Sequence, residues 1–152
     1  MKVTHKLGFS MEFPENWHIT QDPNPDIALV GAAPPDKFGF SRNVTVSVGD
    51  AESYGETMDV WHEQTFEALT NALDDAQLID VVIDSDSFRR IITYVAATRV
   101  VTLEQWVRLW NTDRGVLGVT ISATTPNLQF TECAEEMNDI AWSFDEGKGA
   151  TQ

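Results

Sequence analysis

The sequence contains the beginnings of two metal-binding motifs, and neither motif is complete. His62-Glu63 starts like the zinc-protease motif His-Glu-x-x-His, but Phe66 stands where the second histidine is required. Asp84-Ser85-Asp86 starts like a calcium loop, but Phe88 and Arg89 occupy the positions that need a ligand oxygen and a glycine. The histidines are widely spaced and the chain has one cysteine, so no cluster has metal-site spacing. We therefore expect no bound metal.

Motifs for covalent catalysis and phosphate binding are also missing. The sequence has no Gly-x-Ser-x-Gly elbow, no GxGxxG fingerprint and no Walker lysine loop. Cys133 follows Glu132 beside the apolar stripe of an acidic helix, and neighbouring carboxylates raise the pKa of a thiol. A nucleophile needs the opposite shift, so we interpret Cys133 as a small packed side chain. The sequence thus predicts no catalytic residue, no cofactor and no enzymatic activity.

A strand rich in tryptophan and arginine is the first candidate for a binding surface. One face of this strand carries Trp106, Arg108 and Trp110, and its other face is aliphatic. Aromatic and arginine side chains are enriched at the centres of protein interfaces. Large aromatics are also often buried, so a second interpretation places both tryptophans in a core that covers the sheet on each face.

A loop containing two phenylalanines is the second candidate. Phe38 and Phe40 flank Gly39 in a segment that follows Pro34-Pro35. Two aromatic side chains beside a flexible glycine form either an exposed anchor for a partner or a cover over one end of the sheet. Both interpretations stay open at this point.

The charge of the chain limits its partners. The 152 residues include 10 Lys and Arg against 24 Asp and Glu, a net charge of −14. This charge repels a phosphate backbone and an anionic membrane, so we expect neither as a partner. Residues 43–88 contain no Lys or Arg, whereas residues 87–126 carry five arginines and two acids, a net charge of +3. We predict that a protein partner contacts residues 87–126 through Arg108 and the neighbouring tryptophans.

Hydrophobic periodicity predicts short strands and two long helices. The expected strands cover residues 9–13, 17–20, 27–30, 43–48, 78–83, 89–97, 100–110 and 117–123, with a turn over 22–26 and a loop over 31–42. The first helix is expected over residues 57–73. The second is expected to begin at Thr125-Pro126, because Thr caps helices and Pro suits the first helical position. Its apolar stripe contains Phe130, Ala134, Met137, Ala141 and Phe144.

The order of these elements predicts an α+β fold. Consecutive strands joined by short turns are antiparallel, because a parallel pair needs a crossover of about a dozen residues or more. We expect a single domain over residues 1–146, in which an antiparallel meander carries the long helices, and a flexible tail over residues 147–152. No signal peptide, lipobox or transmembrane segment is visible, so a soluble, cytoplasmic protein is the default expectation.

Four short stretches resemble the PsbP-like proteins and their bacterial DcrB and LpqN relatives. Residues 8–17 are similar to the opening of that family, where an aromatic strand ends in Pro and a Trp begins the next strand. Residues 40–46 are similar to the stretch before the first long helix, although Arg42 replaces a proline that often precedes the Asn. Residues 114–120 and 140–144 are similar to the closing strand and the end of the closing helix.

The resemblance implies an α/β/α sandwich, shared with the Ran-binding Mog proteins, and non-catalytic roles in photosystem assembly, the cell envelope or effector chaperoning. We therefore expect a non-catalytic protein-binding, adaptor or chaperone-like module of this bacterial family, with another protein as its partner. The alternative is a small-ligand carrier or enzyme with a pocket between sheet and helix. A closed sandwich with an exposed Trp106 or Phe38 favours the module, and a polar cavity with convergent acids favours the alternative.

Overall fold

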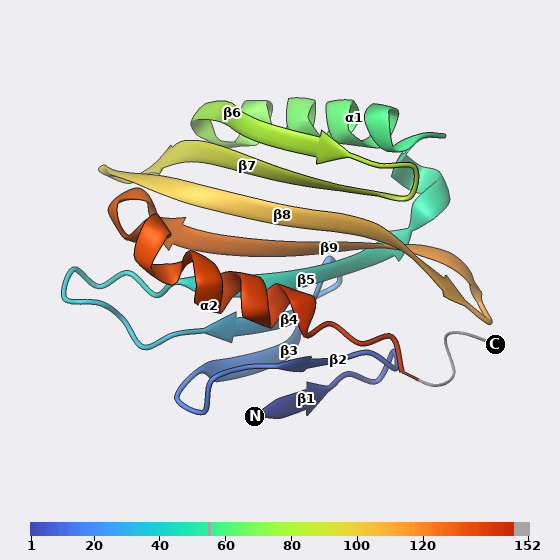
Figure 1. Cartoon of the computed structure of the whole chain (residues 1–152), viewed down its shortest axis with the longest axis horizontal. Coiled ribbons are helices and arrows are strands. Elements are labelled where there is room, and N and C mark those ends of the chain that lie inside the picture. Colours follow the sequence, from blue (N-terminus) through green and yellow to red (C-terminus); the bar gives the residue numbers. More distant parts are fainter. Residues whose placement is uncertain (55, 148–152) are drawn as a thin grey trace.

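Alternating apolar and polar residues produce seven strands that join in one sheet (Figure 1). The computed structural model describes residues 1–54 and 56–147. The strands of this sheet are β3 (His18–Asn24), β4 (Ile27–Ala32), β5 (Asn43–Asp50), β6 (Asp74–Ile83), β7 (Ser87–Ala96), β8 (Arg99–Thr112) and β9 (Gly115–Pro126). Their spatial order is β3-β4-β5-β9-β8-β7-β6, and all neighbouring pairs are antiparallel. The predicted α+β fold with an antiparallel meander is confirmed.

Helix α1 (Met58–Ala72) covers one face of the β6–β8 half of the sheet (Figure 1). Its side chains Met58 and Trp61 are buried and pack against Phe88 of β7 and Val107 of β8. This second, smaller core explains why the helix stays attached although most of its residues are exposed. A short 3-10 helix, η1 (Ala51–Tyr54), precedes it.

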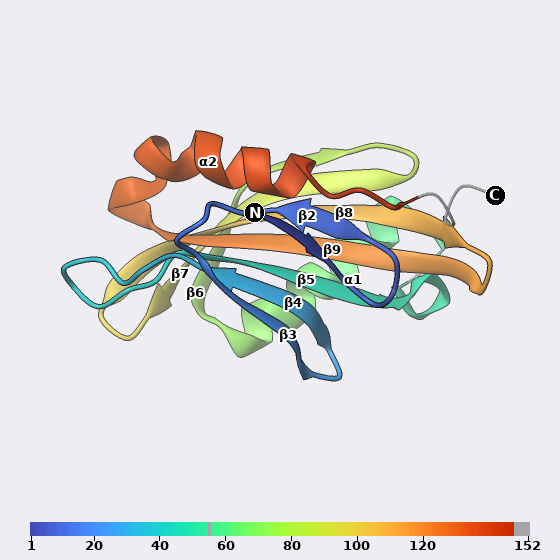
Figure 2. The same ribbon diagram turned by 90° about the horizontal axis from the view of Figure 1, so that it is seen from below.

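Helix α2 (Phe130–Trp142) lies on the opposite face, mainly over β5 and β9, as Figure 2 shows. Met137, Ile140 and Ala141 of the helix are buried in the main core, together with Phe144 just beyond its end. One helix on each face of the sheet makes the α/β/α arrangement that the resemblance implies.

A short N-terminal hairpin completes the layer that contains α2. Strand β1 (Lys2–Thr4) pairs with β2 (Ser10–Glu12), and the side chains of Phe9 and Met11 are fully buried. Sequence periodicity misses β1, because three residues give too little alternation to recognise. The backbones of Ser10 and Asp145 also exchange two hydrogen bonds of 2.9 Å, which join the two ends of the chain.

The predicted start of the second helix at Thr125-Pro126 is wrong. Pro126 has extended dihedrals, φ −55° and ψ 135°, and it pairs with Val101 at the end of β9. Strand β8 is long enough to pair with β9 up to this point, and the fixed φ of proline also suits an extended strand end. A 3-10 turn, η2 (Asn127–Gln129), follows, and α2 begins at Phe130.

Two further predicted boundaries need comment. The predicted turn over residues 22–26 is shorter than expected, because β3 continues to Asn24 through a register shift, with Asp22 at φ 49°. The predicted flexible tail, residues 147–152, lies outside the described residues except for Gly147. Among the helices described, none is long and apolar enough to cross a membrane.

Candidate functional site

A groove of about 620 Å³ lies between the end of α2 and the turn that joins β6 to β7. It exists because α2 packs mainly on β9, β5 and β2 and leaves part of β7 and β8 uncovered. We call it the α2 groove. The side chains that matter for its chemistry are Val82, Asp84, Asp86, Arg89, Trp106, Arg108, Trp142, Phe144 and Glu146.

Strand alternation places Trp106 and Arg108 on the groove side of β8. Trp106 is partly buried against the main core, and its indole nitrogen is buried without a hydrogen-bond partner among the described residues. The Arg108 guanidinium lies 5.1 Å from the centre of the Phe144 ring and forms an ion pair with Glu146. Trp106 and Arg108, which the sequence places on one face of a strand, both line this concave surface.

A second arginine in the groove is also paired. Arg89 stands directly opposite Trp106 in the β7–β8 ladder and forms an ion pair with Glu104, whose side chain is buried. Burial raises the pKa of Glu104, and the hydrogen bond and charge of Arg89 oppose that increase. Both groove arginines are thus already neutralised by carboxylates of the chain itself.

The most exposed aromatic residue of the groove is Trp142, at the end of α2. Its side chain is 73 % exposed, and its indole N–H donates to Asn138 Oδ1 at 3.0 Å, one helical turn earlier. This hydrogen bond holds the ring in place on the surface. Trp142 was not predicted as a site residue, although one signal was available: it lies off the apolar stripe that runs through Met137, Ala141 and Phe144.

Trp110 belongs to the core and takes no part in the groove. It is 1 % exposed and lies edge-on against the rings of Phe9 and Phe144, with centroids 6.0 Å away in both cases. The N-terminal hairpin and the residues after α2 cover this position. Its predicted role as a binding residue is therefore not supported, and the core interpretation applies to it.

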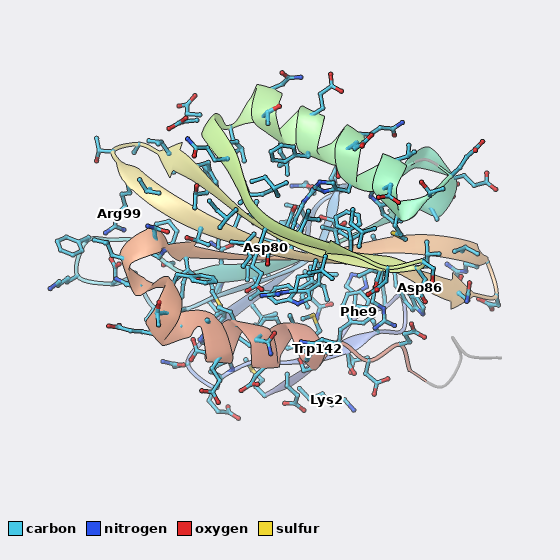
Figure 3. The ribbon with its side chains drawn as sticks, turned by 45° about the horizontal axis from the view of Figure 1, so that its top comes forward. Lys2, Phe9, Asp80, Asp86, Arg99 and Trp142 are labelled. Atoms are coloured by element: carbon cyan, nitrogen blue, oxygen red, sulfur yellow. The ribbon has the colours of Figure 1, made fainter. Side chains whose placement is uncertain are left out.

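Phe38 and Phe40 lie at the other end of the molecule. The Arg99 guanidinium is 5.3 Å from the Phe38 ring centre and 5.5 Å from that of Phe40, and it pairs with Asp36 at 3.7 Å. Figure 3 shows Arg99 and Asp86 at opposite ends of the sheet, so this loop and the groove are separate surfaces. Phe38 is 69 % exposed, whereas Phe40 is half-buried.

The arginines of residues 87–126 do not form one positive surface. Arg89, Arg99 and Arg108 each pair with a carboxylate, and Arg90 is buried on the opposite face, beneath α1. Asp36 and Glu146, which lie outside this segment, thus offset two of its three net positive charges, and Arg114 is exposed at the β8–β9 turn. Electrostatic attraction of an acidic partner to these strands has little basis in the folded protein.

The described residues also contain a histidine–carboxylate pair. Buried His5 contacts Asp22 Oδ1 through Nε2 at 2.8 Å, and its Nδ1 accepts the Leu7 N–H at 3.1 Å. Both ring nitrogens are thus occupied, and neither can activate a nucleophile. Cys133 is half-buried, and burial is the main cause that raises its thiol pKa, as expected for a packed cysteine.

The part of the chain that the structure describes contains no candidate metal site. Within residues 1–54 and 56–147, no three His, Cys, Asp or Glu side chains form a group that could hold a metal ion. The α2 groove instead combines exposed aromatic surface with carboxylates and paired arginines. Such a surface suits recognition of a partially apolar partner.

No protein-family model matches the chain, and no curated protein matches its sequence. Solved structures do resemble it over almost its whole length. The PsbP protein of Synechocystis sp. PCC 6803 has a TM-score of 0.62 at 16% identity, over 95% of this chain and 91% of that one. LpqN of Mycobacterium tuberculosis, involved in cell envelope biogenesis, has a TM-score of 0.65 at 13% identity, over 95% and 88%.

The similarity extends to a eukaryotic protein. The Ran-binding protein Mog1p of Saccharomyces cerevisiae has a TM-score of 0.62 at 12% identity, over 95% of this chain and 94% of that one. At such low identities the likeness concerns the fold. The resemblance predicted from four short sequence stretches is therefore confirmed at this level, and the chain has the PsbP-like fold.

Proposed function

We propose that this chain is a non-catalytic protein-binding module that docks its partner in the α2 groove. The observation that carries the proposal is the exposure of Trp142 at the rim of a concave surface whose floor contains Trp106. Tryptophan is the residue type most enriched among interface hot spots, where truncation to alanine typically costs about 2 kcal/mol or more. An adaptor or chaperone-like role is part of this proposal.

The local structure around Trp142 supports binding. Its indole N–H is held by Asn138, so the ring is already ordered before a partner arrives. Ordering a free side chain costs roughly 0.5–1.5 kcal/mol on association, and this hydrogen bond avoids part of that cost. The yeast Mog1p protein, with the same fold, is Ran-binding, which supports the use of this fold for protein recognition.

The competing function is carriage of a small molecule. A volume of about 620 Å³ lies within the usual range of ligand pockets, roughly 300–1,000 Å³. The Trp142 ring nevertheless stands largely in solvent rather than enclosing a cavity. This openness favours a macromolecular partner over a small ligand, which needs most of its surface covered.

A photocrosslinking experiment tests the proposal. The photoreactive residue p-benzoylphenylalanine replaces Trp142 in one variant and Leu128 in another, and both are expressed in the cell of origin. Leu128 is 96 % exposed and lies outside the groove, so it controls for random contacts. We expect a discrete protein adduct from position 142 that position 128 does not give. For the partner so identified, Trp142→Ala should raise Kd by about 30-fold, and Leu128→Ala should leave it unchanged.

Three results would contradict the proposal. The first is the same set of adducts at both positions. The second is a small molecule that co-purifies with the wild-type chain in native mass spectrometry and is lost from Trp142→Ala. The third is a partner whose Kd does not respond to Trp142→Ala. In the third case the loop of Phe38 and Phe40 becomes the candidate surface, and Phe38→Ala tests it in the same assay.

A further inference from the structure

We propose that the partner segment received by the α2 groove is a basic amphipathic peptide. Its apolar side chains pack on Trp106 and Trp142, and its Lys or Arg side chains face the carboxylates of the β6 edge. This inference rests on the proposed function and names the chemistry of the partner.

The unpaired charge beside the groove is negative. Asp84 and Asp86 line the groove, and Asp80 lies on β6, the edge strand next to them. We call these three residues the acidic rim. All three side chains are exposed, and none forms an ion pair with any of the residues described. Figure 3 labels Asp80 and Asp86 along this edge and Trp142 at the end of α2.

The two arginines of the groove, unlike the acidic rim, are already paired and so are not free to bind a charged partner. Arg89 is bound to Glu104, and Arg108 is bound to Glu146. An acidic peptide would have to displace one of these carboxylates, and displacing Glu104 would leave it buried without a partner. A basic peptide meets the acidic rim without breaking any ion pair, so charge complementarity favours it.

Apolar surface supplies the other half of the recognition. Val82 of β6 and Trp142 of α2 are both largely exposed and line the groove from different elements. Between them lie Trp106 and Phe144, which are covered on their inner sides by the core. An apolar side chain placed here would contact aromatic groups that are already fixed in position.

The same charges argue against other occupants. A second copy of the chain carries the same net charge of −14 and an identical acidic rim, so two copies repel each other at this surface. Nucleic acids and anionic lipid surfaces are repelled for the same reason. A basic segment of a different protein is the occupant that the charges favour.

Selection from a peptide library tests the inference. Random 12-residue peptides displayed on phage are panned against the wild-type chain, and enriched sequences are synthesised with a fluorescein label. We expect enriched peptides to combine two or more apolar residues with two or more Lys or Arg. Kd is measured by fluorescence polarisation between 50 and 300 mM salt, and circular dichroism confirms that every variant is folded.

Matched variants separate the apolar and the charged contributions. Trp142→Ala should raise Kd by about 30-fold, as for an aromatic hot spot. The double variant Asp84→Asn and Asp86→Asn should raise Kd by about 3-fold to 10-fold and weaken its salt dependence, because rim charges act mainly on association. Leu128→Ala and Asp113→Asn remove an exposed apolar group and an exposed acid elsewhere, and both should leave Kd unchanged.

The outcomes distinguish this inference from the proposed function. Enriched peptides that are neutral or acidic, yet depend on Trp142, show that the groove binds proteins and that the basic partner is wrong. Peptides that bind Trp142→Ala as well as wild type contradict both. If no peptide is enriched, the partner is not a short linear segment and the inference fails, while crosslinking at position 142 decides the proposed function.

Discussion

Arg90 Nη1 lies 3.0 Å from Nδ1 of His62, in a buried network between the sheet and α1. Arg90 is 2 % exposed and has no carboxylate partner among the described residues. It also donates to the side-chain oxygen of Gln105 at 2.8 Å and to the backbone carbonyl of His62 at 3.1 Å. A guanidinium is always a donor, so the His62 ring must be neutral and accept through Nδ1.

Acidification should destabilise the protein through this contact. Burial, and then the charge of Arg90, hold the pKa of His62 below its usual value of 6.5. As the pH falls through 6.5, His62 becomes protonated in the unfolded chain, whereas the buried ring of the folded protein stays neutral. The free energy of unfolding therefore decreases with falling pH until the folded ring is also protonated. Urea unfolding between pH 5 and pH 8 measures this slope.

The variant His62→Gln provides the control for that titration. The amide oxygen of glutamine can accept from Arg90 but does not titrate, so this variant should lose less stability than wild type between pH 7 and pH 5.5. Equal slopes for the two proteins would show that titrating groups other than His62 determine the pH dependence. Removing Arg90 is less informative, because it also leaves Gln105 without its donor.

The two tryptophans Trp110 and Trp142 should respond oppositely to truncation. Trp110→Ala removes a fully buried ring and should lower the free energy of unfolding by about 3–5 kcal/mol. Trp142→Ala removes an exposed ring and should change it by about 0.5 kcal/mol or less. Thermal unfolding followed by circular dichroism compares the two. A large loss from Trp142→Ala would mean that the ring is structural, and the proposed docking role would lose its main support.

Gly118 of β9 should not tolerate a methyl group. A Cβ at this position would lie 2.4 Å from Cη2 of Trp61, a buried side chain of α1. Gly118→Ala should therefore lower the free energy of unfolding by about 1–3 kcal/mol through overpacking. The double variant with Trp61→Phe should recover part of the loss, since the smaller ring leaves room. Additive effects in this double-mutant cycle would show that the clash is absent.

The contact between Arg99 and the Phe38 loop should be weak but measurable. Arg99 is partly exposed, so Arg99→Ala should lower the free energy of unfolding by about 1 kcal/mol or less. Hydrogen exchange of residues 36–40 should become faster, because the loop loses its stacking partner at the β7–β8 turn. Lys37→Ala serves as the control, since its ammonium lies above Phe38 but does not join the loop to the turn. Unchanged hydrogen exchange of residues 36–40 in Arg99→Ala would show that contacts other than the one with Arg99 keep the loop ordered.

The strands and their antiparallel arrangement could be predicted from the sequence, because local alternation decides which residues face the core. Val44 and Val46 alternate with Thr45, and both valines are fully buried. The end of α2 was also predictable from the stripe that includes Met137. The start of α2 was not, because Thr125-Pro126 fits a helix cap and a strand end equally well. The length of the neighbouring strand β8 decides between the two.

The candidate site could be predicted only in part, because burial depends on elements far away in the chain. Trp106 and Trp110 occupy the same face of β8, and nothing local distinguishes them. The N-terminal hairpin and Phe144 cover Trp110, whereas Trp106 stays at the floor of the groove. Trp142 was missed because the apolar stripe of α2 predicts only which side chains face the core. It does not predict that a large side chain off the stripe borders a groove. The pairing of each arginine also depends on tertiary contacts.

The position of β9 has a consequence for how the chain becomes a folded protein on the ribosome. β9 pairs with β5 on one side and with β8 on the other, although it follows all the other strands of the sheet in the sequence. Until it emerges, β3–β5 and β6–β8 are two half-sheets, each with an unpaired edge that invites aggregation. The two halves of the sheet can therefore join only after β9 has been synthesised. The backbone hydrogen bonds between Ser10 and Asp145 then join the N-terminal hairpin to the segment that follows α2.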